Sequence, residues 1–233
     1  MRVWLHRSVG NETGWNAWCL DLLGFATWAR SEEEVLGRVP AKVGEHLAWL
    51  ESHGLSGTSP ESGLEVVERV SGDEVLFSAD RSAGSAQTVD LAIRLLEASR
   101  KDLLRVMDGV PEGAMDWDPP YSSFASWATW RSIRQILAHI ANTETHYYLA
   151  KIGWRPVCAP AQERAEWREF LHEHRTETVN RLRELCASGD LCRLRQRPDD
   201  EWSVSKVLRR LIRHELLHRK SISRIVGAFQ ERM

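Results

Sequence analysis

The C-terminal part of the chain predicts one long amphipathic helix that presents two histidines on the same face. Between Trp202 and Phe229 apolar residues recur every three or four positions, and Ser203 stands where a helix cap is expected. His214 and His218 are four residues apart, so their imidazoles lie one above the other on this helix. Two imidazoles at this spacing are typical of half a metal site. The other ligands must come from elsewhere in the chain.

Three further helices are predicted upstream of this one, with no strand signal between them. The first keeps its leucines on one stripe and ends at the Gly109 to Pro111 break, and a long connection, 109–130, follows it. The remaining two cover about 132–152 and 161–187. Four long helices in succession predict a four-helix bundle. The long connection is the place where the topology can depart from a simple up-and-down order.

The first eighty residues predict a small module that contains both strands and a helix. A capping box, Ser31 with Glu34, begins a helix that runs to about residue 53. The expected strands alternate apolar and polar residues or follow glycine turns, and they cover 2–7, 15–20, 25–29, 64–70 and 74–77. The order is therefore ββ(β)αβ(β). The whole chain is predicted as an α+β protein of two domains, 1–80 and 91–233, joined by a small, polar linker at 81–90.

Composition narrows the class of protein. The chain has 233 residues, and residues 1–80 hold 6 Lys/Arg against 13 Asp/Glu, a balance of 6 − 13 = −7, whereas the remainder carries +5. This distribution does not favour nucleic acid as a partner of the N-terminal part. No apolar run is long enough to span a membrane, and the first residues lack the apolar stretch of a signal peptide, so we expect a cytoplasmic protein. The four cysteines lack Cys-x-x-Cys spacing, so no thiolate zinc site is indicated.

The last helix also contains the pattern of zinc peptidases. His214-Glu215-Leu216-Leu217-His218 reads His-Glu-x-x-His, in which the glutamate is the general base. That hypothesis needs a further ligand downstream, and only 15 residues follow His218. A metal site completed by a third ligand from an upstream helix is the better hypothesis. Glu215 is then not expected to act as a general base.

Two segments support that completion, because they resemble the signature segments of the DinB-like (YfiT-like) superfamily of four-helix-bundle metalloproteins. They are 130–144 and 201–218, and the resemblance extends over about 88–230. It implies that His139, His214 and His218 bind one divalent metal ion, with zinc or nickel expected. This chain differs from the usual first segment by an arginine after Trp130 and by Gln135 in place of glutamate. Three neutral imidazoles leave coordination positions open, as catalytic sites require.

The same resemblance implies a function. Members of the superfamily include S-transferases for low-molecular-weight thiols and a thiol-dependent isomerase, so a metal-dependent thiol transferase that acts on a small electrophile is expected here. A metal would ionise the thiol, because the thiolate is the nucleophile. The expected partners are a small-molecule substrate and a second copy of the chain in a homodimer, without nucleic acid or membrane. The sequence assigns no catalytic residue.

The N-terminal module resembles the HicB-like small α/β domain. The resemblance rests on Trp15 to Trp18, on Gly24 to Trp28 and on the segment that begins at Ser31. HicB-like domains occur in antitoxins that bind a toxin, which implies an alternative function, namely a non-catalytic stress-response or interaction module that binds a partner through residues 1–80.

The other histidines and the arginines of the last helix are predicted to have structural or solvated roles. His146 falls near the face of His139 and is expected to pack in the bundle, whereas His172 and His174 are expected in solvent. The basic residues around the last helix, among them Arg209 and Arg210, are expected to form a solvated face.

Overall fold

The computed structural model places a four-stranded sheet at the N-terminal end of the chain and confirms the predicted hairpin. It describes residues 1–9, 13–56, 63–82, 84–121, 128–196 and 200–232. The strand order is β3-β2-β1-β4, with β4 parallel to β1 and the other neighbours antiparallel. The strands are β1 (Arg2–Ser8), β2 (Gly14–Trp18), β3 (Ala26–Ala29) and β4 (Glu65–Ser71).

Both faces of this sheet are covered. Val3 and Leu5 of β1 pack with the buried valines of α1 (Glu32–Ser52), whose first turn is capped by the Ser31 hydroxyl. Trp4, on the opposite face, packs with Trp18 and Phe77. Apolar side chains on both faces of one short strand explain why the module needs a helix on one side and a second layer on the other.

Residues 74–77 were predicted as a strand, and this prediction is wrong. The carbonyl groups of Glu74 and Val75 accept hydrogen bonds from the side chains of Lys206 (2.9 Å) and Arg209 (3.3 Å) instead of pairing with a strand. The segment then turns into a short 3₁₀ helix, Ser78–Arg81. The module therefore has the order βββαβ.

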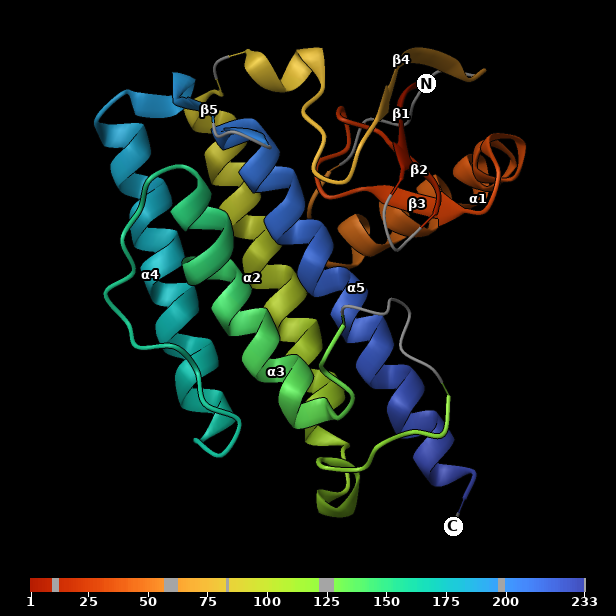
Figure 1. Cartoon of the computed structure of the whole chain (residues 1–233), viewed down its shortest axis with the longest axis vertical. Coiled ribbons are helices and arrows are strands. Elements are labelled where there is room, and N and C mark those ends of the chain that lie inside the picture. The colour runs from red at the N-terminus through yellow and green to blue at the C-terminus, as the bar shows by residue number, and fades with distance from the viewer. Residues whose placement is uncertain (10–12, 57–62, 83, 122–127, 197–199, 233) are drawn as a thin grey trace.

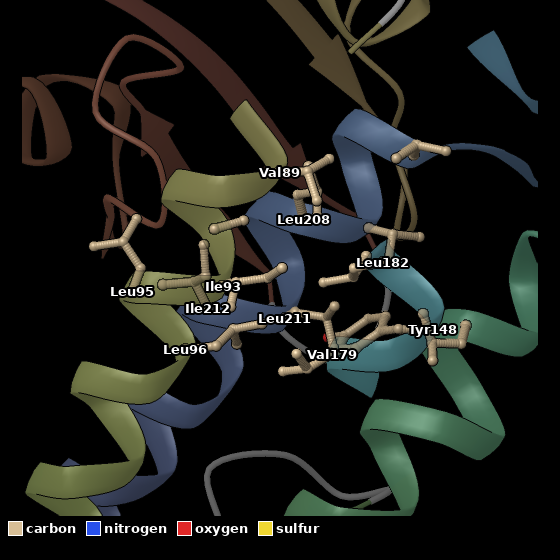
Figure 2. Close-up of a cluster of buried hydrophobic side chains, with 14 of the residues drawn as sticks. Val89, Ile93, Leu95, Leu96, Tyr148, Val179, Leu182, Leu208, Leu211 and Ile212 are labelled. Atoms are coloured by element: carbon tan, nitrogen blue, oxygen red, sulfur yellow. The ribbon is translucent and has the colours of Figure 1, made fainter. Parts of the chain in front are cut away.

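The second half of the chain confirms the predicted four-helix bundle, in which α2, α3, α4 and α5 lie side by side (Figure 1). Leucines and valines of α2, α4 and α5 and Tyr148 meet in its core (Figure 2). The helices are α2 (Ala86–Asp108), α3 (Ile133–Asn142), α4 (Trp167–Ala187) and α5 (Val204–Gln230). α2 begins inside the range that was predicted as a linker, and the division into domains at 81–90 stays a prediction.

Three details of the bundle were not predicted. α3 continues as a π-helical segment, Thr143–Leu149. α4 begins at Trp167 and not near 161, because the Asn142 side chain bonds both the N–H and the carbonyl of Ala161 and holds it outside the helix. Two short strands, β5 (Leu194–Gln196) and β6 (Glu201–Ser203), pair before α5. Of the long connection, residues 122–127 lie outside the described chain.

The N-terminal module lies against the first half of α5 (Figure 1), and one buried and one half-buried ion pair join them. Arg209 is 3% exposed, bonds Asp80 (2.8 Å) and lies over the rings of Trp18 and Phe77, while Arg210 bonds Glu74 (2.5 Å). The expectation of a solvated basic face is therefore wrong for these two arginines. Acidic residues of the N-terminal module neutralise them. Among the described helices, none has the length and apolarity needed to cross a membrane.

Gly24 gives a testable measure of this contact. Its φ of 82° is in the left-handed region, and a Cβ at this position would overlap with the Ile212 side chain of α5. Gly24→Ala is expected to lower the free energy of unfolding by about 2–4 kcal/mol, because backbone strain and overpacking add. Gly54→Ala is the matched control, since Gly54 has a φ of 65° and open space around its Cβ position.

Urea unfolding of the two variants separates the two effects. The control is expected to lose only about 1 kcal/mol, from the backbone alone. Equal losses for the two variants would show that α5 does not pack against Gly24.

Candidate metal centre

His214 and His218 are positioned by α5 as the four-residue spacing predicts. The Ser203 hydroxyl accepts the N–H of Lys206 (3.1 Å) and fixes the start of the helix. One turn separates the two histidines on the same face, and their ring centroids are 4.4 Å apart. His218 is buried at 3% exposure, and His214 is half-buried. The pair therefore offers two imidazoles between α5 and its neighbour.

α3 brings His139 to the same place. Its first turn is a capping box in which Ser132 accepts the N–H of Gln135 and Gln135 accepts the N–H of Ser132 (3.2 Å), so glutamine serves the capping role expected of glutamate. Nε2 of His139 lies 2.9 Å from Nε2 of His214, and its ring centroid is 4.8 Å from that of His218. One ring nitrogen of each histidine lies within 4.8 Å of the others. The structure thus brings together the three predicted ligands, hereafter the three-histidine site.

Burial keeps all three imidazoles neutral, which is the form that binds metals. Desolvation lowers the pKa of His139 to about 4 and, with the His139 ring nearby, lowers the pKa of His218 to about 3. The pKa of His214 is well below its ordinary value for the same reason, reinforced by its two histidine neighbours. At neutral pH no proton has to leave before a metal binds.

Aromatic rings enclose the site. Trp130 stacks on His139 with ring centroids 3.5 Å apart and an interplanar angle of 16°, and its edge faces His218 at 5.8 Å. Tyr148 meets His214 edge to face at 5.7 Å. These contacts fix the orientation of each imidazole, and a metal site requires oriented ligands.

The donor set fits a divalent metal ion. Nδ1 of His218 is buried and has no hydrogen-bond partner within the part of the chain that the structure describes. Leaving such a nitrogen unsatisfied costs about 1–3 kcal/mol. In the contact between Nε2 of His139 and Nε2 of His214, one nitrogen donates its proton to the lone pair of the other. That lone pair is the one a metal ion would bind. Three clustered, neutral imidazoles are a donor set suited to zinc, nickel or another borderline metal.

A buried charged network, which was not predicted, lies beside this site. Glu215 is 1% exposed, and its oxygens accept bonds from Ser99 (2.5 Å), Arg100 (2.5 Å) and Arg175 (2.6 Å). Glu144 accepts from both arginines at 2.7 Å. Each of the four helical segments of the bundle contributes one charge to this buried network, which consists of Arg100, Glu144, Arg175 and Glu215.

The network removes Glu215 from the chemistry of the three-histidine site. Both of its oxygens are engaged, and the arginines hold the pKa of Glu215 at about 2 against the effect of its burial. A carboxylate in this state is a poor general base. The peptidase interpretation of the His-Glu-x-x-His pattern is therefore not supported.

The prediction that His174 is solvated is wrong. His174 is fully buried, and its Nδ1 lies 2.7 Å from the Thr145 hydroxyl, which is 2.9 Å from Nδ1 of His146. His172 is exposed, as predicted. The signal was present in the sequence, because His174 falls four residues after Phe170 and eight before Leu182 on the apolar stripe of α4.

The bundle gathers three neutral imidazoles from two of its helices at one place. The family model of the DinB superfamily matches residues 95–222, more than half of the chain, so the chain belongs to the DinB superfamily, which is metal-associated. Comparison with curated proteins and with solved structures found no match. The family match does not reach residues 1–80, so the HicB-like resemblance of the N-terminal module stays a prediction.

The low pKa values predict an acid-sensitive metal-free protein. A histidine whose pKa falls on folding takes up a proton more readily when unfolded, so stability is lost as the pH falls from about 6.5 toward the folded value. For His139, with a folded pKa of about 4, the loss between pH 7 and pH 5 is about 2 kcal/mol. Guanidinium unfolding of the chelator-treated protein at pH 7 and at pH 5 measures this loss of stability.

His139→Gln is expected to reduce the difference between pH 7 and pH 5 by about that amount, because glutamine does not titrate. The exposed His172 gives the control variant, His172→Gln, which should retain the full pH dependence. An unchanged pH dependence in His139→Gln would mean that this imidazole is not buried in its neutral form.

Proposed function

We propose that the protein is a metal-dependent enzyme whose three-histidine site holds one divalent ion, zinc or nickel, and that it transfers a low-molecular-weight thiol to a small electrophile. One observation carries the metal part of this proposal, namely the convergence of His139, His214 and His218 as neutral imidazoles. Membership of a metal-associated superfamily supports it. The thiol chemistry rests on the resemblance to thiol transferases of that superfamily.

The side chains around the site have distinct roles under this proposal. His139, His214 and His218 hold the ion, and a bound ion supplies the charge that lowers the pKa of a thiol. Trp130 covers the outer face of the His139 ring and excludes water from that side. His139 and His214 are half-buried, whereas His218 is buried, so the first two ligands lie nearer to solvent than the third. Three protein ligands leave room for a substrate.

A conjugation assay tests the proposal. Full-length protein, stripped by chelator and reloaded with zinc or nickel, is incubated with cysteine, glutathione or coenzyme A and with a fluorogenic chlorinated electrophile such as monochlorobimane. Conjugation above the rate without protein is expected for at least one thiol, and it should disappear after chelation. His218→Ala is expected to fall to the background rate, because the site then lacks its most buried ligand.

His172→Ala is the matched control, since His172 is exposed on α4 and is not a member of the three-histidine site. It should react as the wild type does. Conjugation that survives in His218→Ala would overturn the proposed role of the site. Metal binding without conjugation of any thiol would refute the thiol-transfer part and favour the alternative, in which residues 1–80 bind a protein partner.

A further inference from the structure

We propose that His146, Cys158 and His174 form a second metal site, separate from the three-histidine site, which takes a zinc-class divalent ion through one thiolate and two imidazoles. His146 lies in the π-helical continuation of α3, Cys158 in the connection that follows it and His174 on α4. The two groups share no residue. The three positions are 12 and 16 residues apart, so no short Cys or His motif marks them in the sequence.

One pair of ligand atoms already has the spacing that zinc requires. Sγ of Cys158 and one ring nitrogen of each imidazole lie within 4.8 Å of one another, and Sγ is 3.5 Å from Nδ1 of His174. In a tetrahedral zinc site, with Zn–S of about 2.3 Å and Zn–N of about 2.0–2.1 Å, sulfur and nitrogen are about 3.6 Å apart. One edge of the coordination tetrahedron is therefore preformed.

The Thr145 hydroxyl indicates where these ligands converge. It lies 2.9 Å from Nδ1 of His146, 2.7 Å from Nδ1 of His174 and 3.8 Å from Sγ of Cys158. A hydroxyl has one proton and two lone pairs, so it can bond both imidazoles at once. Nδ1 of both imidazoles therefore faces one point beside the Cys158 thiol. An ion bound there would replace the hydroxyl as the common partner of the imidazoles.

Glu177 holds the cysteine in place and supplies negative charge. Its carboxylate accepts the backbone N–H groups of Val157 (2.9 Å) and Cys158 (2.8 Å) and the indole N–H of Trp154 (2.5 Å). These bonds keep the pKa of Glu177 at about 2, although desolvation raises it. Glu177 and His174 lie three residues apart on α4, so one turn of helix presents an imidazole and an anchor for the loop that carries the thiol.

The chemistry of the group suits a soft or borderline metal. Burial, and then the Glu177 carboxylate, raise the pKa of the Cys158 thiol to about 11, so the cysteine is a neutral thiol unless a cation is present. A metal ion bound by a thiol displaces its proton, so binding releases one proton per ion. Two imidazoles, one thiolate and an open fourth position for an oxygen ligand make up a typical zinc donor set.

Cobalt(II) titration of the full-length, metal-stripped protein tests the proposal. Thiolate coordination to cobalt gives an intense near-ultraviolet charge-transfer absorption, whereas a site made only of imidazoles gives none. We expect this absorption to saturate by two equivalents per chain, because the three-histidine site also takes up cobalt, and at one equivalent in a variant that lacks the three-histidine site. It should be lost in Cys158→Ser and shifted to at least tenfold higher cobalt concentration in His146→Gln, which keeps the thiol.

Two control variants separate this site from the other. Cys192→Ser removes an exposed cysteine and should leave the absorption unchanged. The double variant His139→Ala, His218→Ala should retain it as well, because the three-histidine site has no sulfur, so failure of one site does not imply failure of the other. The proposal would be overturned if the wild type showed no charge-transfer absorption. It would also be overturned if the absorption persisted in a Cys158→Ser variant whose circular dichroism shows that it is folded like the wild type.

Discussion

Replacing His218 with alanine is expected to weaken zinc binding at the three-histidine site by on the order of 10²- to 10³-fold. Loss of an outer partner of a metal ligand alone costs about 10- to 100-fold, and loss of the ligand itself costs more. His218 is also the most buried of the three, with its Nδ1 unpaired among the described residues. Competition with a chromophoric chelator measures the affinity.

The measurement is sharpest in the Cys158→Ser background, where no thiolate competes for the ion. His139→Ala should weaken binding to a similar extent, and His172→Ala should not, because His172 is exposed and does not belong to the group. If His218→Ala binds zinc as tightly as its parent, these three imidazoles do not hold the ion.

Glu215→Gln is expected to destabilise the protein by about 3–5 kcal/mol. The substitution leaves Arg100 and Arg175 with Glu144 as their one acidic partner in the network, and breaking a buried ion pair from one side leaves an uncompensated charge. The side chains of these two arginines are only 10% and 9% exposed, so water cannot take the place of the carboxylate. A fall of about 10 °C in the melting temperature is expected for a chain of this size.

Glu184→Gln provides the matched comparison on a neighbouring surface. Glu184 pairs with Arg181 at 3.0 Å, but its side chain is 57% exposed, and such pairs contribute less than about 1 kcal/mol. Thermal unfolding of both variants by circular dichroism makes the comparison. A loss for Glu215→Gln as small as that for Glu184→Gln would contradict the buried network.

Local patterns predicted the helices of the bundle well, because amphipathic periodicity and serine caps are properties of neighbouring residues. Ser132 and Ser203 cap α3 and α5 as their positions indicate. The set of three histidines required the family resemblance in addition, since nothing in the spacing relates His139 to α5. The structure brings the three together, and the family match covers all of them.

The buried network escaped prediction because a charged residue on a helix is ordinarily taken as part of its solvated face. A signal was nevertheless present. Arg100 lies on the stripe formed by Leu96 and Leu103, and Glu215 continues the stripe of Leu208 and Leu211. A charge at an apolar position of the helical repeat predicts a buried charge, which needs a partner of opposite sign from another helix.

Features that depend on tertiary contacts could not be predicted from the sequence. The π-helical segment Thr143–Leu149 follows residues of ordinary helical propensity, and no local pattern distinguishes it from the α3 sequence before it. Residues 74–77 follow a glycine turn and are mostly apolar, as a short strand would be, but long side chains of α5, Lys206 and Arg209, bond the carbonyl groups that a strand would use. Competition for backbone hydrogen bonds by distant residues overrides local preference.

The most direct test of the central claim is the position of the metal itself. In crystals of the full-length protein grown or soaked with zinc, data collected at the zinc absorption edge should show an anomalous peak about 2.0–2.1 Å from one ring nitrogen each of His139, His214 and His218. Zinc bound elsewhere in the crystal, with these three imidazoles hydrogen-bonded to one another and no peak between them, would contradict the assignment of the three-histidine site.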